Sequence, residues 1–442
     1  MAVGDIPDKR RGPDKIRGLS RSMALALVVG NLIGSGVYLL PGTLAPLGVN
    51  QIFGWMVTIA GALAMALVFA RLGAMRPMAG GPYAYAQAAF GPFAGFVTAW
   101  SYWILLWSGN GAIALAVVSN LSLVIPGMAH VPGLPAVLSV GCVWLLTFVN
   151  MRGVRQAGEV SLVTTLIKLV PLLAVIALAA WLWLGGTPFV VQAPVPVASG
   201  SIAAAAGLTF WGFLGLESAT VPADKVEDAK HVVPMATLVG TVLTGVIYLG
   251  ISLAFLAYMP NDAAAASPAP VAAFLGRHFG GAIAGAVAVF AAISAFGTLN
   301  GFILLQGEMP WAMARGGVFP LWFAAESAAG TPVRAHLVSS VLMSAVMLLN
   351  FGRGMSDLFQ FIASVSLAAG MLSYAMTMFA AIRLLPEERL LIPVALFAAA
   401  FTGWATWGLG LEAMVYAAVL LLIGVPIYFA VRRSRGLPLA PA

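Results

Sequence analysis

Residues 30–41 of the chain read GNLIGSGVYLLP, and residues 210–218 read FWGFLGLES. Both stretches place several glycines inside a long apolar run. Glycine lowers helix propensity by about 1 kcal/mol relative to alanine and allows unusual backbone angles, so clustered glycines favour a break in a helix. Unwound backbone within a membrane is tolerated only where it is buried in protein or lines a wet cavity. A close-packing face between membrane helices explains either stretch alone equally well.

The composition around these stretches is that of a membrane protein. The chain has 442 residues, of which 61% are hydrophobic and 8% are charged, and its mean hydropathy is +0.98. An ordinary soluble domain carries roughly 25% charged residues. A soluble globular protein, a disordered chain and a nucleic-acid binder are therefore excluded, and the lipid bilayer is the expected partner.

The sequence offers no pattern for a metal or a cofactor. The single cysteine, Cys142, lies in an apolar run, and the four histidines show no HxxxH or HxxE spacing. A disulfide framework, an iron–sulfur cluster and a CxxC redox site are excluded on this count. We expect no metal ion and no cofactor.

Apolar runs long enough to cross a bilayer recur about twelve times, since a spanning helix needs about 20 apolar residues. Nearly all of the 22 Lys and Arg residues then fall on one side, and Arg277 and Arg353 on the other. Because basic residues are retained in the cytoplasm, both termini are expected there. The predicted spans are 20–46, 52–72, 92–125, 133–151, 159–184, 202–222, 234–258, 281–313, 334–351, 356–383, 390–407 and 413–432.

The two glycine-rich breaks lie in the first and sixth predicted spans, which start roughly 180 residues apart. This spacing fits a five-helix repeat over 20–184, a second over 202–383 and two additional helices over 390–432, between tails 1–19 and 433–442. Secondary transporters often place their binding site between such paired broken helices. The pairing therefore favours transport over simple helix packing.

Two charged residues lie deep in predicted spans, Lys168 in the fifth and Glu217 in the sixth. An unpaired charge at the bilayer centre costs at least about 2.5 kcal/mol, so such residues are functional candidates by default. Burial disfavours the charged form of any side chain, so either residue can be a proton carrier. The alternative is a structural tether, with Lys168 donating to carbonyls of the unwound first span and Glu217 bonded to hydroxyls. Both roles stay open, and they can coexist.

Five segments together resemble the amino acid–polyamine–organocation (APC) superfamily, and within it the bacterial arginine/agmatine antiporters. They are GNLIGSGVYLLP (30–41), GGPYAYAQAAFGP (80–92), YWILLWSGN (102–110), FWGFLGLESATVPA (210–223) and SVSLAAGMLSY (364–374). The resemblance covers the chain after the basic tail. It implies an all-α membrane protein with a LeuT-like inverted repeat of five plus five helices, two C-terminal helices that form a possible homodimer interface, and a place in the bacterial inner (cytoplasmic) membrane.

The resemblance also implies where a substrate amino acid would bind. Its carboxylate would be held by the backbone and hydroxyl groups of Gly34, Ser35 and Gly36, and its amino group by the carbonyl of Leu32. Free N–H donors at a helix break bind an anion without a buried cation, so the physics agrees.

The side-chain end of the implied site comes from other spans. Trp211 corresponds to an aromatic lid over the substrate, and Leu214 follows it in the same span. Asn110 and Ser366 match polar contacts to the substrate side chain. Phe302 stands where the antiporters have a second gating tryptophan, which keeps the apolar face and loses the indole N–H donor.

Gating and proton coupling are implied by a further group of residues. Tyr102, Glu217 and Tyr374 match an outer gate of two phenols and a carboxylate, and Tyr83 matches a cytoplasmic-side tyrosine involved in pH response. Lys168 replaces a small apolar residue of the antiporters, while other superfamily members carry a lysine there in place of a sodium ion.

Two transport hypotheses follow. The first is an amino acid/amine exchanger, such as an arginine/agmatine antiporter, that works by alternating access. The alternative is a proton-coupled uptake permease for neutral or cationic amino acids that uses Lys168. An enzyme is not expected, because the sequence lacks a nucleophile–base constellation and a GxxxxGK[ST] loop. A sensor would need a soluble output domain, which no loop is long enough to form.

Overall fold

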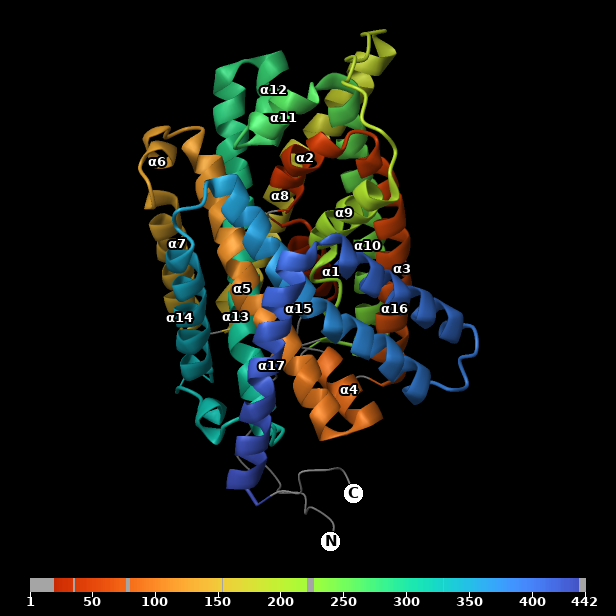
Figure 1. The fold of residues 1–442 in the computed structure, drawn as a ribbon, viewed down its shortest axis with the longest axis vertical. Helices are drawn as coiled ribbons and strands as arrows, with labels where there is room; N and C mark the ends of the chain where they lie inside the picture. The colour runs from red at the N-terminus through yellow and green to blue at the C-terminus, as the bar shows by residue number, and fades with distance from the viewer. Residues whose placement is uncertain are drawn as a thin grey trace.

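The computed structural model describes residues 20–34, 36–76, 80–152, 154–220, 226–328 and 330–436. The predicted tail 1–19, the substrate-binding candidate Ser35 and the last part of the tail 433–442 lie outside the described residues. The described elements are α-helices joined by short 3₁₀ helices and loops (Figure 1). They are α1 (Arg21–Leu32), α2 (Gly36–Leu44), η1 (Ala45–Leu47), α3 (Asn50–Met75), α4 (Pro82–Phe90), α5 (Pro92–Ser122), α6 (Gly127–His130), α7 (Leu134–Asn150), α8 (Val154–Leu184), α9 (Ser199–Phe210), η2 (Trp211–Phe213), α10 (Ala229–Tyr258), α11 (Asn261–Ala266), α12 (Pro270–Phe279), α13 (Gly281–Arg315), η4 (Leu321–Ala324), α14 (Val333–Leu349), α15 (Met355–Leu384), α16 (Leu391–Gly408) and α17 (Leu411–Ser434).

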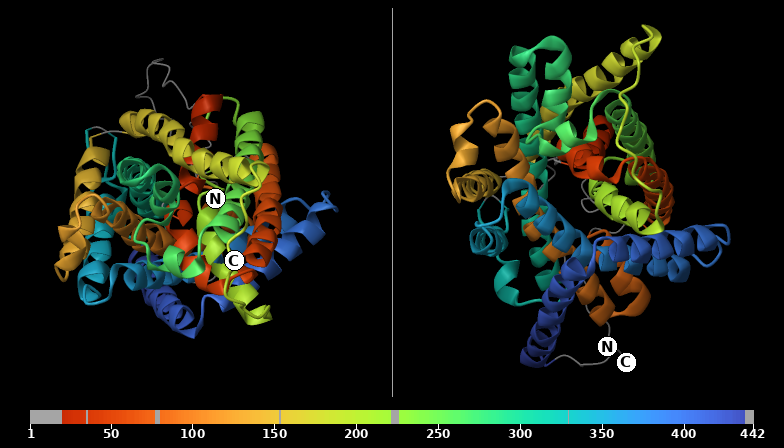
Figure 2. Two further views of the ribbon diagram at one scale, coloured as in Figure 1. Left: turned by 90° about the horizontal axis from the view of Figure 1, so that it is seen from above. Right: turned by 45° about the horizontal axis from the view of Figure 1, so that its top comes forward.

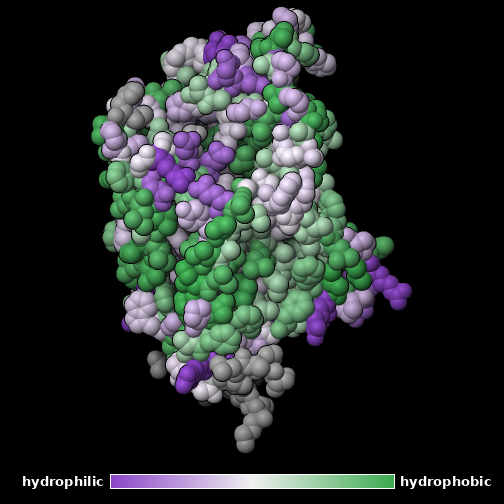
Figure 3. Space-filling view, viewed as in Figure 1, coloured by the Kyte–Doolittle hydropathy of each residue, from purple (hydrophilic) through white to green (hydrophobic). Residues whose placement is uncertain are grey.

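The helices confirm a multi-pass membrane protein. Within the described residues, nine segments are long and apolar enough to cross a membrane, counting α1, α2 and η1 as one segment. Two more apolar helices, α7 and α14, are shorter, and α9 ends at Phe210. Hydrophobic residues cover the middle of the face seen in Figure 3, and hydrophilic residues gather towards its upper part and its lower edge.

Both glycine-rich stretches leave helical geometry. The helix α1 ends at Leu32, the chain bends at residues 33 and 34, and α2 begins at Gly36. In the sixth predicted span, α9 passes into the 3₁₀ helix η2, and the chain then continues in turns to residue 220. Gly215 adopts a φ of +99°, in a region that residues with a side chain rarely enter. The sequence therefore breaks these two helices at the positions where its glycines cluster.

The helix α5 forms the centre of the bundle. It packs most extensively against α15 and α13, and nearly all of its residues are buried. The last two helices lie at the periphery: α17 runs along one side of the molecule, and α16 projects outward (Figures 1 and 2). Residues of α17 that point away from the bundle, such as Leu411 and Leu422, are highly exposed apolar side chains.

One expected loop is a helix. The segment 80–92, which the predicted spans 52–72 and 92–125 leave as a connection, contains α4. Gly81 has a φ of +51° and precedes Pro82 at the first helical position, while Gly91 has a φ of +88° and ends the helix. Proline at the start and glycine at the end are the residues that suit those positions, and their presence explains why so short a segment is helical.

Candidate functional site

A small cavity lies where the two broken helices meet α5 and α13. Its volume is about 20 Å³, which is room for about one water molecule. An amino acid is larger, so binding one requires the surrounding side chains to move. The lining residues are Asn31, Leu32, Gly34, Gly36, Leu105, Gly109, Ile113, Trp211, Leu214, Thr298 and Phe302.

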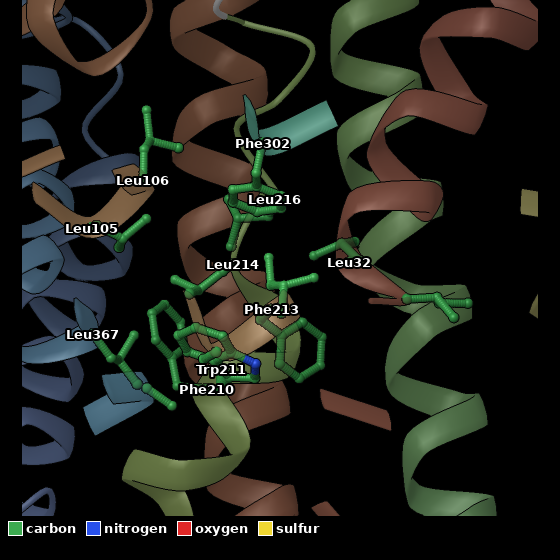
Figure 4. Close-up of a cluster of buried hydrophobic side chains, with 14 of the residues drawn as sticks. Leu32, Leu105, Leu106, Phe210, Trp211, Phe213, Leu214, Leu216, Phe302 and Leu367 are labelled. Atoms are coloured by element: carbon green, nitrogen blue, oxygen red, sulfur yellow. The ribbon is translucent and has the colours of Figure 1, made fainter. Parts of the chain in front are cut away.

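Most of the substrate-binding candidates from the sequence meet at this cavity. Figure 4 shows Trp211 and Leu214 between Leu32 on one side and Leu105 on the other. The indole of Trp211 also packs edge-on against Phe359, with ring centroids 6.1 Å apart. A Cβ atom at Gly36 would lie 2.8 Å from Cδ1 of Trp211, so the glycine allows the indole to lie against the start of α2.

Asn110 and Ser366 do not line the cavity in this conformation. The amide Nδ2 of Asn110 donates to Oε1 of Gln306 at 2.7 Å. The hydroxyl of Ser366 pairs with that of Ser108 at 2.8 Å and donates to the carbonyl of Ile362. Both side chains are fully buried and already bonded within the protein.

The backbone of the first break is held by its neighbours. The carbonyl of Leu32 accepts from the amide of Gly34 at 2.9 Å and from the hydroxyl of Tyr248 at 2.5 Å. Asn31, in the last turn of α1, donates through Nδ2 to Oγ of Ser218 at 2.8 Å and so joins the two broken spans. A carbonyl oxygen has two lone pairs, so the Leu32 carbonyl is fully used here.

Lys168 reaches this same break from α8. Its Nζ donates to the carbonyl of Gly30 at 2.5 Å and to Oγ1 of Thr298 at 2.6 Å. The side chain is 1% exposed. The backbone carbonyl of Lys168 accepts from the hydroxyl of Tyr38, a residue of α2. Lys168 therefore contacts both halves of the broken first span.

Tyr102, Glu217 and Tyr374 come together as one buried group. The Tyr102 hydroxyl donates to Oε1 of Glu217 at 2.7 Å, and the Tyr374 hydroxyl donates to Oε2 at 2.8 Å. All three residues are fully buried. The carboxylate thus joins α5, α15 and the segment after η2.

The position of this group bears on two sequence predictions together, the outer gate and the cytoplasmic termini. Tyr102 lies about two turns before Gly109 on α5, and thus about 10 Å nearer the end that adjoins α4. Figure 1 places α4 and the end of α17 at the same end of the molecule. The three residues therefore lie on the side of the cavity where the described chain ends, and an outer position is incompatible with cytoplasmic termini.

Tyr83 is remote from the cavity. It lies on α4, and its hydroxyl lies against Gly316, at the end of α13. Burial raises the pKa of Tyr83 to about 12. The phenol therefore stays protonated throughout the neutral range in this conformation.

Sequence reasoning missed several polar residues that build the site. Asn31, Thr298 and Tyr248 bond to the first break or line the cavity, and Gln306 bonds to Asn110. Asn31 lies inside the quoted stretch, where a polar side chain between glycines was an available signal. Within the described ranges, no group of His, Cys, Asp or Glu could hold a metal ion.

Comparisons with known proteins identify the family. A family model described as amino acid permease matches residues 19–434. The cadaverine/lysine antiporter of Escherichia coli strain K12 is 32% identical over 355 residues, which are 79% of this chain and 79% of that protein. The putrescine transporter PotE of the same strain is 28% identical over 91% of this chain and 93% of its own length. PotE of Haemophilus influenzae is also 28% identical, over 91% of this chain and 94% of its own length.

Proposed function

Because this chain belongs to the amino acid permease family of the APC superfamily, and is therefore a transporter and not an enzyme, we propose that it exchanges an amino acid for an amine across the bacterial cytoplasmic membrane. The cavity at the junction of the two broken helices is the observation that carries the proposal. Residues of both breaks and the indole of Trp211 line it, and the buried Lys168 bonds to Thr298 of the lining. Transporters of this kind alternate access around such a central site.

The proposal includes the finer architecture. Twelve spans arise when α7, α14 and the broken segment that begins with α9 are counted with the nine long apolar segments. The proposed architecture also has two five-helix repeats, over 20–184 and 202–383, and two further helices over 390–432 at a homodimer interface. Both termini are cytoplasmic in this proposal. The matched breaks support the repeats, and the exposed apolar side chains on α17 support an interface with lipid or a second copy.

In the proposed site, the first turn of α2 and the residues 34–36 receive the substrate carboxylate. The amide groups at a helix N-terminus are unpaired within the helix and carry a partial positive charge, which suits an anion. The Leu32 carbonyl takes the ammonium once Tyr248 releases it. Trp211, Leu214 and Phe302 then enclose the side chain, and Tyr102, Glu217 and Tyr374 close the path on the terminus side.

The proposed substrates are a basic amino acid and its decarboxylation product. The printed names of the relatives pair lysine with cadaverine and name putrescine, while the sequence motifs suggest arginine and agmatine. Both pairs share one chemistry: the amine keeps the cationic end of the amino acid and lacks its carboxylate. We propose exchange of a basic amino acid for its amine, with lysine/cadaverine and arginine/agmatine as the two candidate pairs.

Proteoliposomes that contain the purified protein separate exchange from its alternative. We expect labelled L-lysine or L-arginine to enter vesicles preloaded with cadaverine or agmatine, and to enter empty vesicles poorly. Trp211→Ala should abolish uptake and the substrate-induced thermal shift while the protein stays monodisperse. Equal uptake into empty and preloaded vesicles would refute exchange.

A second candidate is proton-coupled uptake of neutral or cationic amino acids. The contacts of Lys168 with Gly30 and Thr298 favour it, since a proton change at Nζ would act directly on the first break. An imposed proton gradient should then drive accumulation into vesicles that contain no substrate. A proton ionophore should abolish that accumulation and leave exchange unaffected.

A further inference from the structure

Only the nitrogen end of the Asn110 side-chain amide has a hydrogen-bond partner within the described residues. Its Nδ2 donates to Gln306, but its Oδ1 has no hydrogen-bond partner among the described residues. The side chain is fully buried. A buried acceptor without a partner is costly, and it is uncommon enough in folded proteins to require an explanation.

Gln306 turns the oxygen of its carboxamide towards Asn110, and hydrogen bonds on its other side match that orientation. Nε2 of Gln306 donates to Oγ of Ser340 at 3.1 Å, and that hydroxyl pairs with Thr147 at 2.7 Å. The backbone carbonyl of Gln306 accepts from Ser339, whose hydroxyl also accepts from the indole of Trp103. With its nitrogen bonded to Ser340, Gln306 presents its oxygen to Asn110 and binds the Asn110 nitrogen.

The Asn110–Gln306 pair joins α5 to α13 behind the residues that line the cavity. Gly109 and Ile113, which flank Asn110 on α5, line the cavity, and so does Phe302, one turn before Gln306 on α13. The pair is thus within about one helical turn of the lining residues on both helices.

We propose that Gln306 is a positioning residue that determines substrate specificity: by binding the Asn110 nitrogen, it reserves the Asn110 oxygen for an N–H donor on the substrate side chain. This inference rests on the proposed function. A neutral acceptor suits the ammonium or guanidinium end that a basic amino acid and its amine product share. An aliphatic side chain would leave the oxygen unpaired, and sites built around a hydrogen bond reject analogues that lack the donor.

The test compares L-lysine with L-leucine, which has no side-chain donor, in counterflow by the full-length protein. We expect Gln306→Leu to lower the lysine-to-leucine ratio of kcat/KM on the order of 5-fold, as expected for one hydrogen bond that loses its alignment. In an Asn110→Ala background the same substitution should have no further effect, because Gln306 acts through Asn110. Ser344→Ala is the matched control: it removes another α14 hydroxyl, which accepts from Trp144 and donates to the backbone carbonyl of Ser340, while the Ser340 hydroxyl that binds Gln306 stays in place.

Ser340→Ala provides a second perturbation, since it removes the acceptor that orients Gln306, and it should lower the same ratio if Gln306→Leu does not fold. Equal effects of Gln306→Leu with and without Asn110 would overturn the proposal, and so would a wild-type preference for leucine. A wild-type protein that transports neither amino acids nor amines would instead overturn the proposed function. The two failures are therefore distinguishable.

Discussion

Replacing Lys168 by methionine tests what the buried lysine does at the first break. The ammonium donates to the carbonyl of Gly30 at 2.5 Å and to Thr298 at 2.6 Å. Methionine has nearly the same length and no donor, so the substitution removes both bonds and keeps most of the volume. Neither acceptor is left alone, because the Thr298 hydroxyl also donates to Gly30 at 3.2 Å.

The magnitude follows from these contacts. Hydrogen bonds to a charged group contribute about 1.5–3 kcal/mol each, and removing a buried charge returns part of that as relieved desolvation. We therefore expect Lys168→Met to lower the free energy of unfolding by about 1–3 kcal/mol, with a melting temperature only a few degrees lower. Exchange should slow by about 10-fold or more, since 1.4 kcal/mol at a conformational step corresponds to a factor of ten.

The assay is the initial rate of lysine/cadaverine counterflow in proteoliposomes, measured from acidic to neutral pH. Leu172→Met, at another buried position of α8, is the control for the methionine side chain itself. A wild-type rate in Lys168→Met would refute the tether. A reduced rate with an unchanged pH profile would show that Lys168 does not carry a coupled proton, whereas loss of the pH profile would support the uptake alternative.

Three further substitutions test other parts of the site. Tyr83→Phe should leave the pH profile of transport unchanged below pH 10. Because the pKa of Tyr83 is raised to about 12, the stabilising contribution of this phenol is fully present below pH 10 and is lost as the pH rises through 12. Thermal unfolding should therefore show the wild-type protein weakening relative to Tyr83→Phe only in that range. Gly36→Ala places a Cβ 2.8 Å from the indole of Trp211 and should abolish the lysine-induced thermal shift without unfolding the protein. Tyr374→Phe removes one of the two phenol donors to the buried carboxylate of Glu217 and should cost about 1.5–3 kcal/mol of stability. An unchanged melting temperature would contradict that pairing.

The sequence predicted the helices well because membrane spans are decided by local composition. The predicted span 281–313 corresponds to α13 at Gly281–Arg315, and the predicted span 356–383 to α15 at Met355–Leu384. Local glycine clusters also located both breaks. The helix α4 was missed because at nine residues it is far too short for a hydrophobic-length criterion, although its flanking glycines and proline marked both ends.

Partners of buried polar groups were much harder to predict. Lys168 and Glu217 were conspicuous, since charges inside apolar runs are rare. Their partners were not, because Thr298 and Tyr374 are separated from them by more than a hundred residues and resemble many other hydroxyl-bearing residues. The same reason explains why Gln306 was overlooked: its importance comes from the residue that it faces.

Two groups that the sequence identified as substrate ligands are, in the structure, already bonded within the protein. The Leu32 carbonyl accepts hydrogen bonds from Gly34 and Tyr248, and the nitrogen of the Asn110 amide donates one to Gln306. A substrate ammonium that binds the Leu32 carbonyl therefore replaces an internal hydrogen bond with one of its own, whereas the free oxygen of Asn110 gains a bond. Because one bond is traded for another of similar strength, the net gain per contact is about 0.5–1.5 kcal/mol or less. A site of this design binds without holding its ligand tightly, and an exchanger needs that property, since it must release each substrate on the opposite side before taking the next.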